Sequence, residues 1–210
     1  MRKKSLFISF EGIDGVGKST QVKLLRNWMT KRGFKVFLTR EPGGGPLSEK
    51  IRRLLLDPKL KMSPLTELLL YEAARAEHVK AVIEPALNKG FVVISDRFMD
   101  ASTAYQGGAR GLTFNFVKRL NIIAAGKTQP DLTILLDLPA RLGLSKAISR
   151  SKTKKGDRLE NEGWKFLEKV RRAYLALAAG EPSRIKVVKV QKTIEATQEL
   201  IRANVSRKLK

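Results

Sequence analysis

The strongest chemical signal in the sequence is a glycine-rich segment near the amino terminus, residues 12–19. It matches the pattern G-x-x-x-x-G-K-[ST] at every position. In such a loop the backbone N–H groups surround phosphate oxygens, Lys18 adds positive charge near the β- and γ-phosphates, and Ser19 offers a hydroxyl to Mg²⁺. The pattern therefore predicts that ATP is bound by Gly12, Ile13, Asp14, Gly15, Val16, Gly17, Lys18, Ser19 and Thr20.

An acidic side chain is expected beside this loop, at the end of a neighbouring strand, where it can bind Mg²⁺ directly or through water. Asp96 directly follows the apolar segment 91–95, and with Ser19 it forms our predicted metal site. Asp137 follows the apolar segment 132–136 and is the alternative, for which we favour a structural role at the strand end. Arg97, next to Asp96, suits a site that binds anions.

The rest of the sequence alternates short apolar runs with longer amphipathic ones, which is typical of a parallel sheet surrounded by helices. We expect strands at 6–10, 36–39, 91–95, 132–136 and 185–190. We expect helices at 18–31, 64–88, 114–125, 139–149, 162–179 and 194–208, with a bend near Pro85. The predicted fold is one α/β domain over 1–210: a P-loop NTPase-type five-stranded parallel sheet with helices on both faces.

The composition restricts the class of protein. Lys and Arg number 42 against 20 Asp and Glu, a formal net charge of +22, so the protein attracts anions. Both a nucleic-acid-binding protein and an enzyme for nucleotide phosphates fit this charge; because the basic residues are spread along the chain, we favour the enzyme. There is no cysteine, and no apolar run reaches the ~20 residues that span a bilayer, so we expect a cytoplasmic protein.

A phosphate-binding loop also occurs in GTPases, which carry an N-K-x-D segment that reads guanine. The Asn88-Lys89 pair in this sequence is followed by Gly90 and Phe91, so that segment is not matched. Nothing in the sequence resembles a second, nucleic-acid-binding domain. At this length, a kinase for small molecules is the better interpretation.

Further segments are specific enough to indicate a family. Over about residues 7–190 the sequence resembles the thymidylate kinases, in the order and spacing of several short motifs. These are residues 10–20 (FEGIDGVGKST), 39–44 (TREPGG), 73–78 (AARAEH), 96–98 (DRF), 104–107 (AYQG), 130–132 (PDL) and 157–160 (DRLE).

The resemblance implies roles for individual residues in binding dTMP. Asp14 would contact the 3′-hydroxyl, Arg75 would donate to thymine O4, and Tyr71 would stack on the base. Arg97 would hold the acceptor phosphate, and Tyr105 would crowd the sugar 2′ position. An arginine donates but never accepts, so it suits a carbonyl oxygen and disfavours the amino group of cytosine. The whole predicted substrate-binding set is Asp14, Glu41, Pro42, Tyr71, Arg75, Arg97, Ser102, Tyr105 and Gln106.

The resemblance also implies a lid at about 149–158, which would close over the reacting phosphates. No cation occupies the variable positions of the phosphate loop, so we expect Arg150 and Arg158 to join Lys18 and Arg97 as catalytic residues. A homodimer is implied as well, with no membrane partner and no nucleic acid. Two alternatives stay open: a kinase for a broader range of deoxynucleoside monophosphates, and a basic P-loop ATPase that binds nucleic acid.

Overall fold

The computed structural model describes residues 5–150 and 158–209. In this part of the chain, five parallel strands form one sheet in the order β2-β3-β1-β4-β5. The strands are β1 (Leu6–Glu11), β2 (Val36–Arg40), β3 (Val92–Asp96), β4 (Leu132–Asp137) and β5 (Ile185–Lys189). The predicted five-stranded parallel sheet is confirmed, with each strand boundary within one residue of its expected position.

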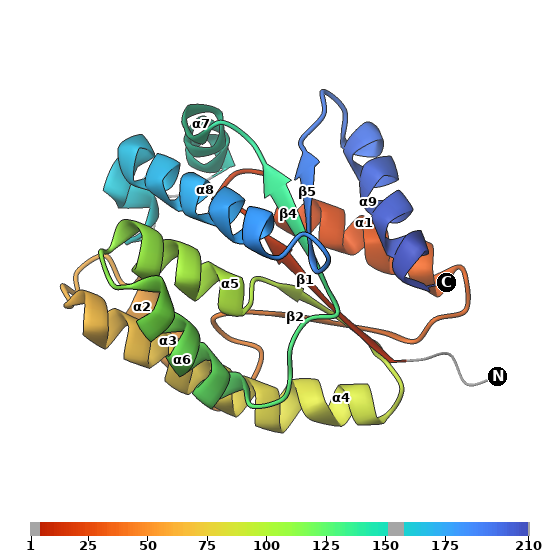
Figure 1. Cartoon of the computed structure of the whole chain (residues 1–210), viewed down its shortest axis with the longest axis horizontal. Helices are drawn as coiled ribbons and strands as arrows, with labels where there is room; N and C mark the ends of the chain where they lie inside the picture. Colours follow the sequence, from red (N-terminus) through yellow and green to blue (C-terminus); the bar gives the residue numbers. More distant parts are fainter. Residues whose placement is uncertain (1–4, 151–157, 210) are drawn as a thin grey trace.

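Helices cover both faces of this sheet, as the sequence predicted. Helices α1 and α9 lie side by side over one face, while α8, α5 and the pair α3 and α6 lie on the other side (Figure 1). The helices are α1 (Lys18–Thr30), α2 (Pro46–Leu56), α3 (Pro64–His78), α4 (Glu84–Asn88), α5 (Met99–Ser102), α6 (Phe114–Ala125), α7 (Ala140–Arg150), α8 (Gly163–Gly180) and α9 (Ile194–Leu209), with π-helical turns η1 (Val79–Ile83) and η2 (Thr103–Ala109) and the 3₁₀ turn η3 (Glu160–Glu162).

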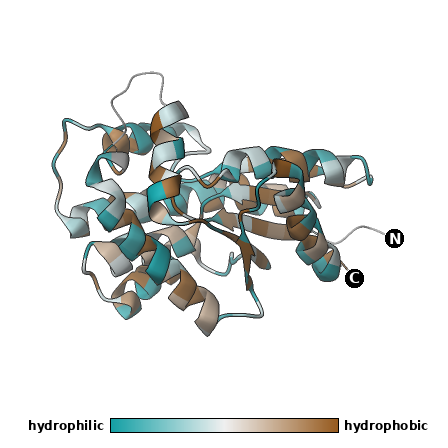
Figure 2. Ribbon diagram, turned by 90° about the horizontal axis from the view of Figure 1, so that it is seen from above, coloured by the Kyte–Doolittle hydropathy of each residue, from teal (hydrophilic) through white to brown (hydrophobic). Residues whose placement is uncertain are grey.

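The central strands are hydrophobic on both faces because both faces are covered. Every residue of β1 is buried, and the apolar strands lie at the centre of the molecule in Figure 2. Helix α1 packs onto the sheet with Val22, Leu25 and Met29, whose spacing places them on one side of the helix. The core therefore fixes β1 and α1 firmly on either side of the loop that joins them.

The order of the strands determines where a ligand can bind. Strand β1 lies between β3 and β4, so the chain changes direction across the sheet at β1. In open parallel sheets such a switch point leaves a crevice beyond the carboxyl ends of the strands. The register of β1 and β3 pairs Phe10 with Asp96, so the end of β3 lies beside the loop that follows β1.

Three helical regions differ from the sequence-based expectation. Helix α2 was not expected, and neither were α5 and η2, which occupy 99–109. The helix expected over 64–88 is present but has three parts, because the π-helical turn η1 precedes the short α4 that contains Pro85. Among the described helices, none combines the length and apolar character that a membrane crossing requires.

Candidate active site

The phosphate loop connects the buried end of β1 to the start of α1. Gly12 and Gly15 have φ angles of 130° and 79°, a backbone region that side chains rarely allow. A Cβ atom on Gly15 would also collide with the carbonyl oxygen of Gly143 in α7. The glycines are therefore required both by the turn and by the close packing of the loop against its neighbours.

Lys18 lies within this loop with its ammonium group turned toward the backbone. Its Nζ donates to the carbonyl oxygens of Gly12 and Ile13, both at 2.9 Å, and the Asp14 carboxylate lies 3.9 Å away. Burial, and then the nearby Arg97 guanidinium, lower the pKa of Lys18 to about 8. An anion that entered the loop would favour the charged ammonium, so the site is prepared for phosphate.

The two predicted metal ligands are in direct contact. The Ser19 hydroxyl donates to Asp96 Oδ2 at 2.6 Å, which joins the first turn of α1 to the end of β3. Hydroxyl and carboxylate oxygens are ligands that bind Mg²⁺, and waters and substrate phosphates usually complete its coordination shell. The alternative, Asp137, is instead held by Arg171 of α8 at 2.6 and 3.1 Å, as expected for a structural carboxylate.

A polar cavity of about 310 Å³ opens in front of the loop. It contains several predicted residues and two arginines that the sequence reasoning missed, Arg40 at the end of β2 and Arg52 on α2. Arg52 donates to the carbonyl of Pro42 at 2.7 Å, which fixes the loop after β2. The residues lining this phosphate cavity are Asp14, Gly15, Gly17, Lys18, Ser19, Arg40, Glu41, Arg52, Asp96 and Arg97.

Arg97 is anchored more completely than its neighbours in this cavity. Its guanidinium donates to Asp14 Oδ1 at 2.6 Å, to the hydroxyl groups of Tyr105 and Tyr174 at 3.1 and 3.2 Å, and to the carbonyl of Gly12 at 3.0 Å. Burial alone would raise the pKa of Asp14, but the charges of Arg97 and Lys18 lower it to about 2. Asp14 is therefore an anion that holds Arg97 in place.

A second, smaller pocket adjoins Arg97 on the other side. It is lined by Tyr71, Arg97, Ala101, Ser102, Tyr105, Gln106 and Leu159. We call it the base pocket, because the sequence predicts that the pyrimidine binds among these residues. The structure thus brings together four of the residues expected around the pyrimidine and sugar, and Arg97 with them. Leu159, from the segment that follows the expected lid, was not foreseen.

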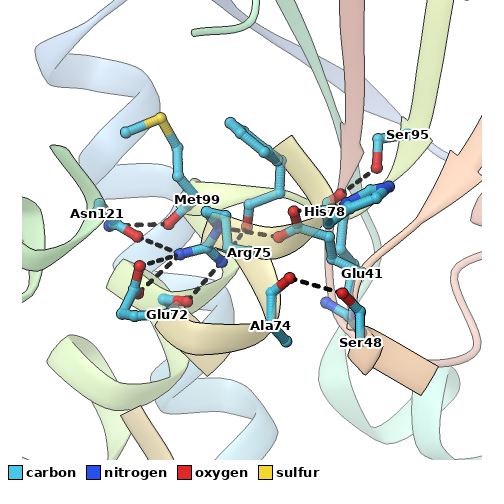
Figure 3. Close-up of polar contacts among 12 residues, drawn as sticks. Glu41, Ser48, Glu72, Ala74, Arg75, His78, Ser95, Met99 and Asn121 are labelled. Carbon is cyan, nitrogen blue, oxygen red and sulfur yellow. Dashed lines mark hydrogen bonds and ion pairs between the residues drawn. The ribbon is translucent and has the colours of Figure 1, made fainter. Parts of the chain in front are cut away.

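Arg75 lies beneath this base pocket and is almost completely buried, with 1% of its surface exposed. Nε donates to Glu41 at 2.9 Å, Nη1 to Glu72 at 2.7 Å and to Asn121 at 2.6 Å, and Nη2 to Ser102 at 2.8 Å (Figure 3). A longer contact of 3.4 Å joins Nη2 to the carbonyl of Phe98. The five N–H groups of this guanidinium therefore all face protein acceptors.

Glu41 connects the base pocket to the phosphate cavity. One oxygen accepts from Arg75, and the other lies 3.0 Å from Nδ1 of His78 (Figure 3). Nε2 of the same ring lies 2.6 Å from the hydroxyl of Thr39. Two buried side chains thus hold Glu41 in position behind the loop after β2. The single histidine of the chain, His78, is fully buried and contacts both Thr39 and Glu41, so it has a structural role here.

Gln106 and Arg158 both contact a buried carboxylate, Glu67 of α3. Gln106 Nε2 donates to Glu67 Oε1 at 2.6 Å, and the Arg158 guanidinium pairs with Oε2 of the same side chain. Arg158 also donates to the carbonyl of Leu55 at 2.9 Å, and it is absent from the lining of the phosphate cavity. The arginine expected in the lid therefore lies at the base of that segment, anchored to α3.

The remaining predicted residues are placed as follows. Ile13 and Val16 are buried beneath the loop, and Thr20 lies exposed on the first turn of α1. Arg150 ends α7, and nothing of its side chain is described. Residues 151–157, the centre of the expected lid, lie outside the described residues.

A further cavity of about 100 Å³ lies on the other side of the phosphate loop, where β5 leads into α9. It includes Gly15 and Gly17 from the loop, Lys146 from α7, and Gln191 and Lys192 from the connection to α9. No pattern in the sequence marked these last residues, because polar side chains in a short connection occur in most proteins.

Comparison with known proteins agrees with this arrangement. The sequence model of the thymidylate kinase family, described as "Thymidylate kinase", matches residues 10–201. A thymidylate kinase of Geobacter sp. (strain M21) is 47% identical over 207 residues, covering 97% of this chain and 92% of the relative. A thymidylate kinase of Syntrophotalea carbinolica is 50% identical over 195 residues, covering 91% and 90%.

A solved structure has the same fold. The crystal structure of thymidylate kinase from Ehrlichia chaffeensis superposes with a TM-score of 0.77 at 31% sequence identity, covering 97% of this chain and 99% of the other. With a family match over most of its length and relatives close to half identical, this chain belongs to the thymidylate kinase family.

Proposed function

We propose that this chain transfers the γ-phosphoryl group of ATP to dTMP, giving dTDP and ADP, as a step of dTTP synthesis. One observation carries the proposal: Arg97 lines both the phosphate cavity and the base pocket. A nucleoside monophosphate whose base lies against the residues of this pocket would place its phosphate at Arg97, facing the phosphate loop. The broader monophosphate kinase and the nucleic-acid-binding ATPase are not favoured by the comparisons with known proteins.

In the reaction, the main task of the chain is to compensate the negative charge of the two phosphate groups that must approach each other. The acceptor phosphate has its second pKa near 6, so it is largely a dianion at neutral pH and needs no general base. Lys18 and the loop N–H groups would hold the β- and γ-phosphates, and Arg97 would neutralise the attacking phosphate and align it with them. Arg40 and Arg52 add positive charge at the same cavity.

Mg²⁺ fits beside the loop at Ser19 and Asp96, the two oxygen donors that lie 2.6 Å apart. When bound, the ion would neutralise charge on the triphosphate of ATP during transfer. The adenosine part of ATP would extend from the loop into the cavity bounded by Lys146 and Gln191.

Recognition of the base would use the residues around the small pocket. Tyr71 offers a face for stacking, and Tyr105, whose hydroxyl binds both Asp14 and Arg97, limits the space beside the sugar. Arg75 would reach thymine O4 through Nη2, because this nitrogen faces Ser102 at the pocket wall and its contact with Phe98 is long. The remaining donors of Arg75 fix the plane of its guanidinium.

Closure of the segment 149–158 would exclude water, which would otherwise hydrolyse ATP. We propose that Arg150 supplies positive charge to the transferred phosphate, since it ends α7, whose Gly143 contacts the phosphate loop. For Arg158 the observed pairing with Glu67 supports a role in holding the base of the lid.

We also propose that two copies form a homodimer through the adjoining helices α2, α3 and α6 (Figure 1). These helices expose several large apolar side chains to solvent, and exposed apolar patches commonly mark interfaces. The side chains are Leu47, Leu54, Leu65, Leu69, Phe116, Ile122 and Ile123.

A cytoplasmic location fits an enzyme that uses ATP and a free nucleotide.

The proposed activity is tested by measuring ADP formation with ATP and Mg²⁺, with and without dTMP, and with and without single- or double-stranded DNA. We expect ADP to form only when dTMP is present, with dTDP in equal amount and no effect of DNA. ADP formation that does not depend on dTMP and increases when DNA is added would instead indicate a nucleic-acid-dependent ATPase.

A further inference from the structure

Arg97 has an unusual backbone conformation for a residue that must hold a phosphate. Its φ angle is 74°, and it is the only residue other than glycine with a positive φ in the described part of the chain. A side chain in this region is sterically strained, and such residues persist only where the surroundings enforce them. The structure should therefore contain groups that keep Arg97 in this conformation.

The backbone around Arg97 is held at three points. The Arg97 N–H donates to the carbonyl of Phe10 at 2.9 Å, and the Ser95 hydroxyl donates to the Arg97 carbonyl at 2.6 Å. The next peptide N–H, that of Phe98, donates to Oε1 of Glu11 at 2.7 Å. The second and third contacts involve side chains, and the third, from Glu11, fixes the peptide immediately after the strained residue.

The other oxygen of Glu11 acts on the opposite end of Arg97. The Tyr174 hydroxyl donates to Glu11 Oε2 at 2.8 Å, and the same hydroxyl accepts from Arg97 Nη1 at 3.2 Å. Glu11 itself has 0% of its surface exposed. One buried carboxyl group thus contacts the backbone beyond Arg97 directly and the guanidinium through Tyr174.

We propose that Glu11 is a positioning residue for Arg97, and that it determines how well the enzyme captures the phosphate of its acceptor. The inference rests on the proposed role of Arg97 in binding the dTMP phosphate. It explains why the last residue of a buried apolar strand is a glutamate, although a buried carboxyl group is costly unless its hydrogen bonds are satisfied. Burial, followed by the charge of Asp100, raises the pKa of Glu11 to about 8.

This role predicts which substitutions the site tolerates. Glu11→Gln keeps an acceptor for the Phe98 N–H and a polar partner for Tyr174, so it should preserve the position of Arg97. Glu11→Leu removes both contacts at similar volume. Tyr174→Phe removes only the link to the guanidinium and leaves the ring packed against Tyr105.

The test compares the Michaelis constants for dTMP and ATP in these three variants and in a matched control, Ser9→Ala. Ser9 is also a fully buried polar residue of β1, but its hydroxyl contacts Thr133 and not the Arg97 network. We expect Glu11→Leu to raise the dTMP constant at least about tenfold, because small displacements of a positioning group are costly, while the ATP constant changes less than about twofold. Tyr174→Phe should raise the dTMP constant about threefold or more, and Glu11→Gln and Ser9→Ala should leave it near the wild-type value.

A folded Glu11→Leu variant with the wild-type Michaelis constant for dTMP would overturn the proposal. So would a Ser9→Ala variant whose dTMP constant rises as much as that of Glu11→Leu. If Glu11→Leu shows no cooperative thermal unfolding, Tyr174→Phe decides, since an unchanged dTMP constant there would exclude the link through Tyr174. Failure of the proposed function gives a different result, because the wild-type protein would then show no dTMP-dependent activity at all.

Discussion

Arg75 provides the sharpest prediction about the base pocket, because we propose two functions for it, recognition of thymine and stabilisation of the fold. From sequence alone, Arg75→Ala should affect only the binding of dTMP. In the structure, Arg75 is paired with two buried carboxylates, Glu41 and Glu72, at 2.9 and 2.7 Å. Removal of the arginine leaves both carboxylates buried without a cation.

The expected loss of stability follows from this burial. Breaking one partner of a buried ion pair typically costs ~3–5 kcal/mol, because the remaining charge stays desolvated. The presence of Asn121 and His78 in the same network allows some relaxation, so we expect Arg75→Ala to lower the free energy of unfolding by about 3 kcal/mol or more. A domain of this size would then unfold at a temperature roughly 6–12 °C lower.

The measurement is urea unfolding followed by circular dichroism, with Arg172→Ala as the control. Arg172 also faces a glutamate, Glu168 at 3.6 Å, but its side chain is 79% exposed, so its removal should leave stability at the wild-type value. Arg75→Lys should recover part of the stability but little of the dTMP affinity, because lysine keeps the charge and loses the fixed planar donors. If Arg75→Ala is as stable as Arg172→Ala, the network does not contribute to stability as we infer.

Three further predictions concern other parts of the site. Lys18→Ala should lower kcat by about 100-fold or more while the melting temperature stays close to that of the wild type, since the ammonium acts on transferred charge; kinase assays and calorimetry test both points. Burial raises the folded-state pKa of Glu11 to about 8, so its contribution to stability is complete below pH ~4.5 and is lost as the pH rises toward 8. The melting temperature of the wild type should therefore decrease between pH 5 and 8, and it should decrease less in Glu11→Gln. Arg150→Gln should lower kcat about tenfold with little change in the dTMP Michaelis constant, whereas Arg158→Gln should mainly lower the melting temperature, as measured by the same two methods.

The parts of the fold with a strong local pattern were predictable from sequence. The glycine spacing of 12–19 and the apolar strands on either side located the phosphate loop, and the contact of Ser19 with Asp96 confirms that the two predicted metal ligands are neighbours. Helix α2 was missed, although its first residue, Pro46, occupies a position where proline commonly starts a helix.

The buried polar contacts could not be predicted in the same way. Glu11 and Tyr174 are separated by 163 residues, and Glu67 and Arg158 by 91, so no local pattern connects them. A glutamate at the end of an apolar strand or within an amphipathic helix normally indicates exposure. Only the three-dimensional arrangement shows that these carboxylates are buried and that each one holds a residue of the site.

The central claim is that the acceptor is dTMP and that the base pocket selects it. The most direct test is the ratio of kcat/KM for dTMP to that for dCMP, measured on the same wild-type preparation. If Arg75 donates to thymine O4, the amino group of dCMP would face the Arg75 N–H, and two donors without an acceptor between them cannot form a hydrogen bond. We therefore expect a ratio of about 100 or more, equivalent to roughly 2.7 kcal/mol. Equal values for the two nucleotides would contradict the account and indicate a kinase that does not distinguish the pyrimidine base.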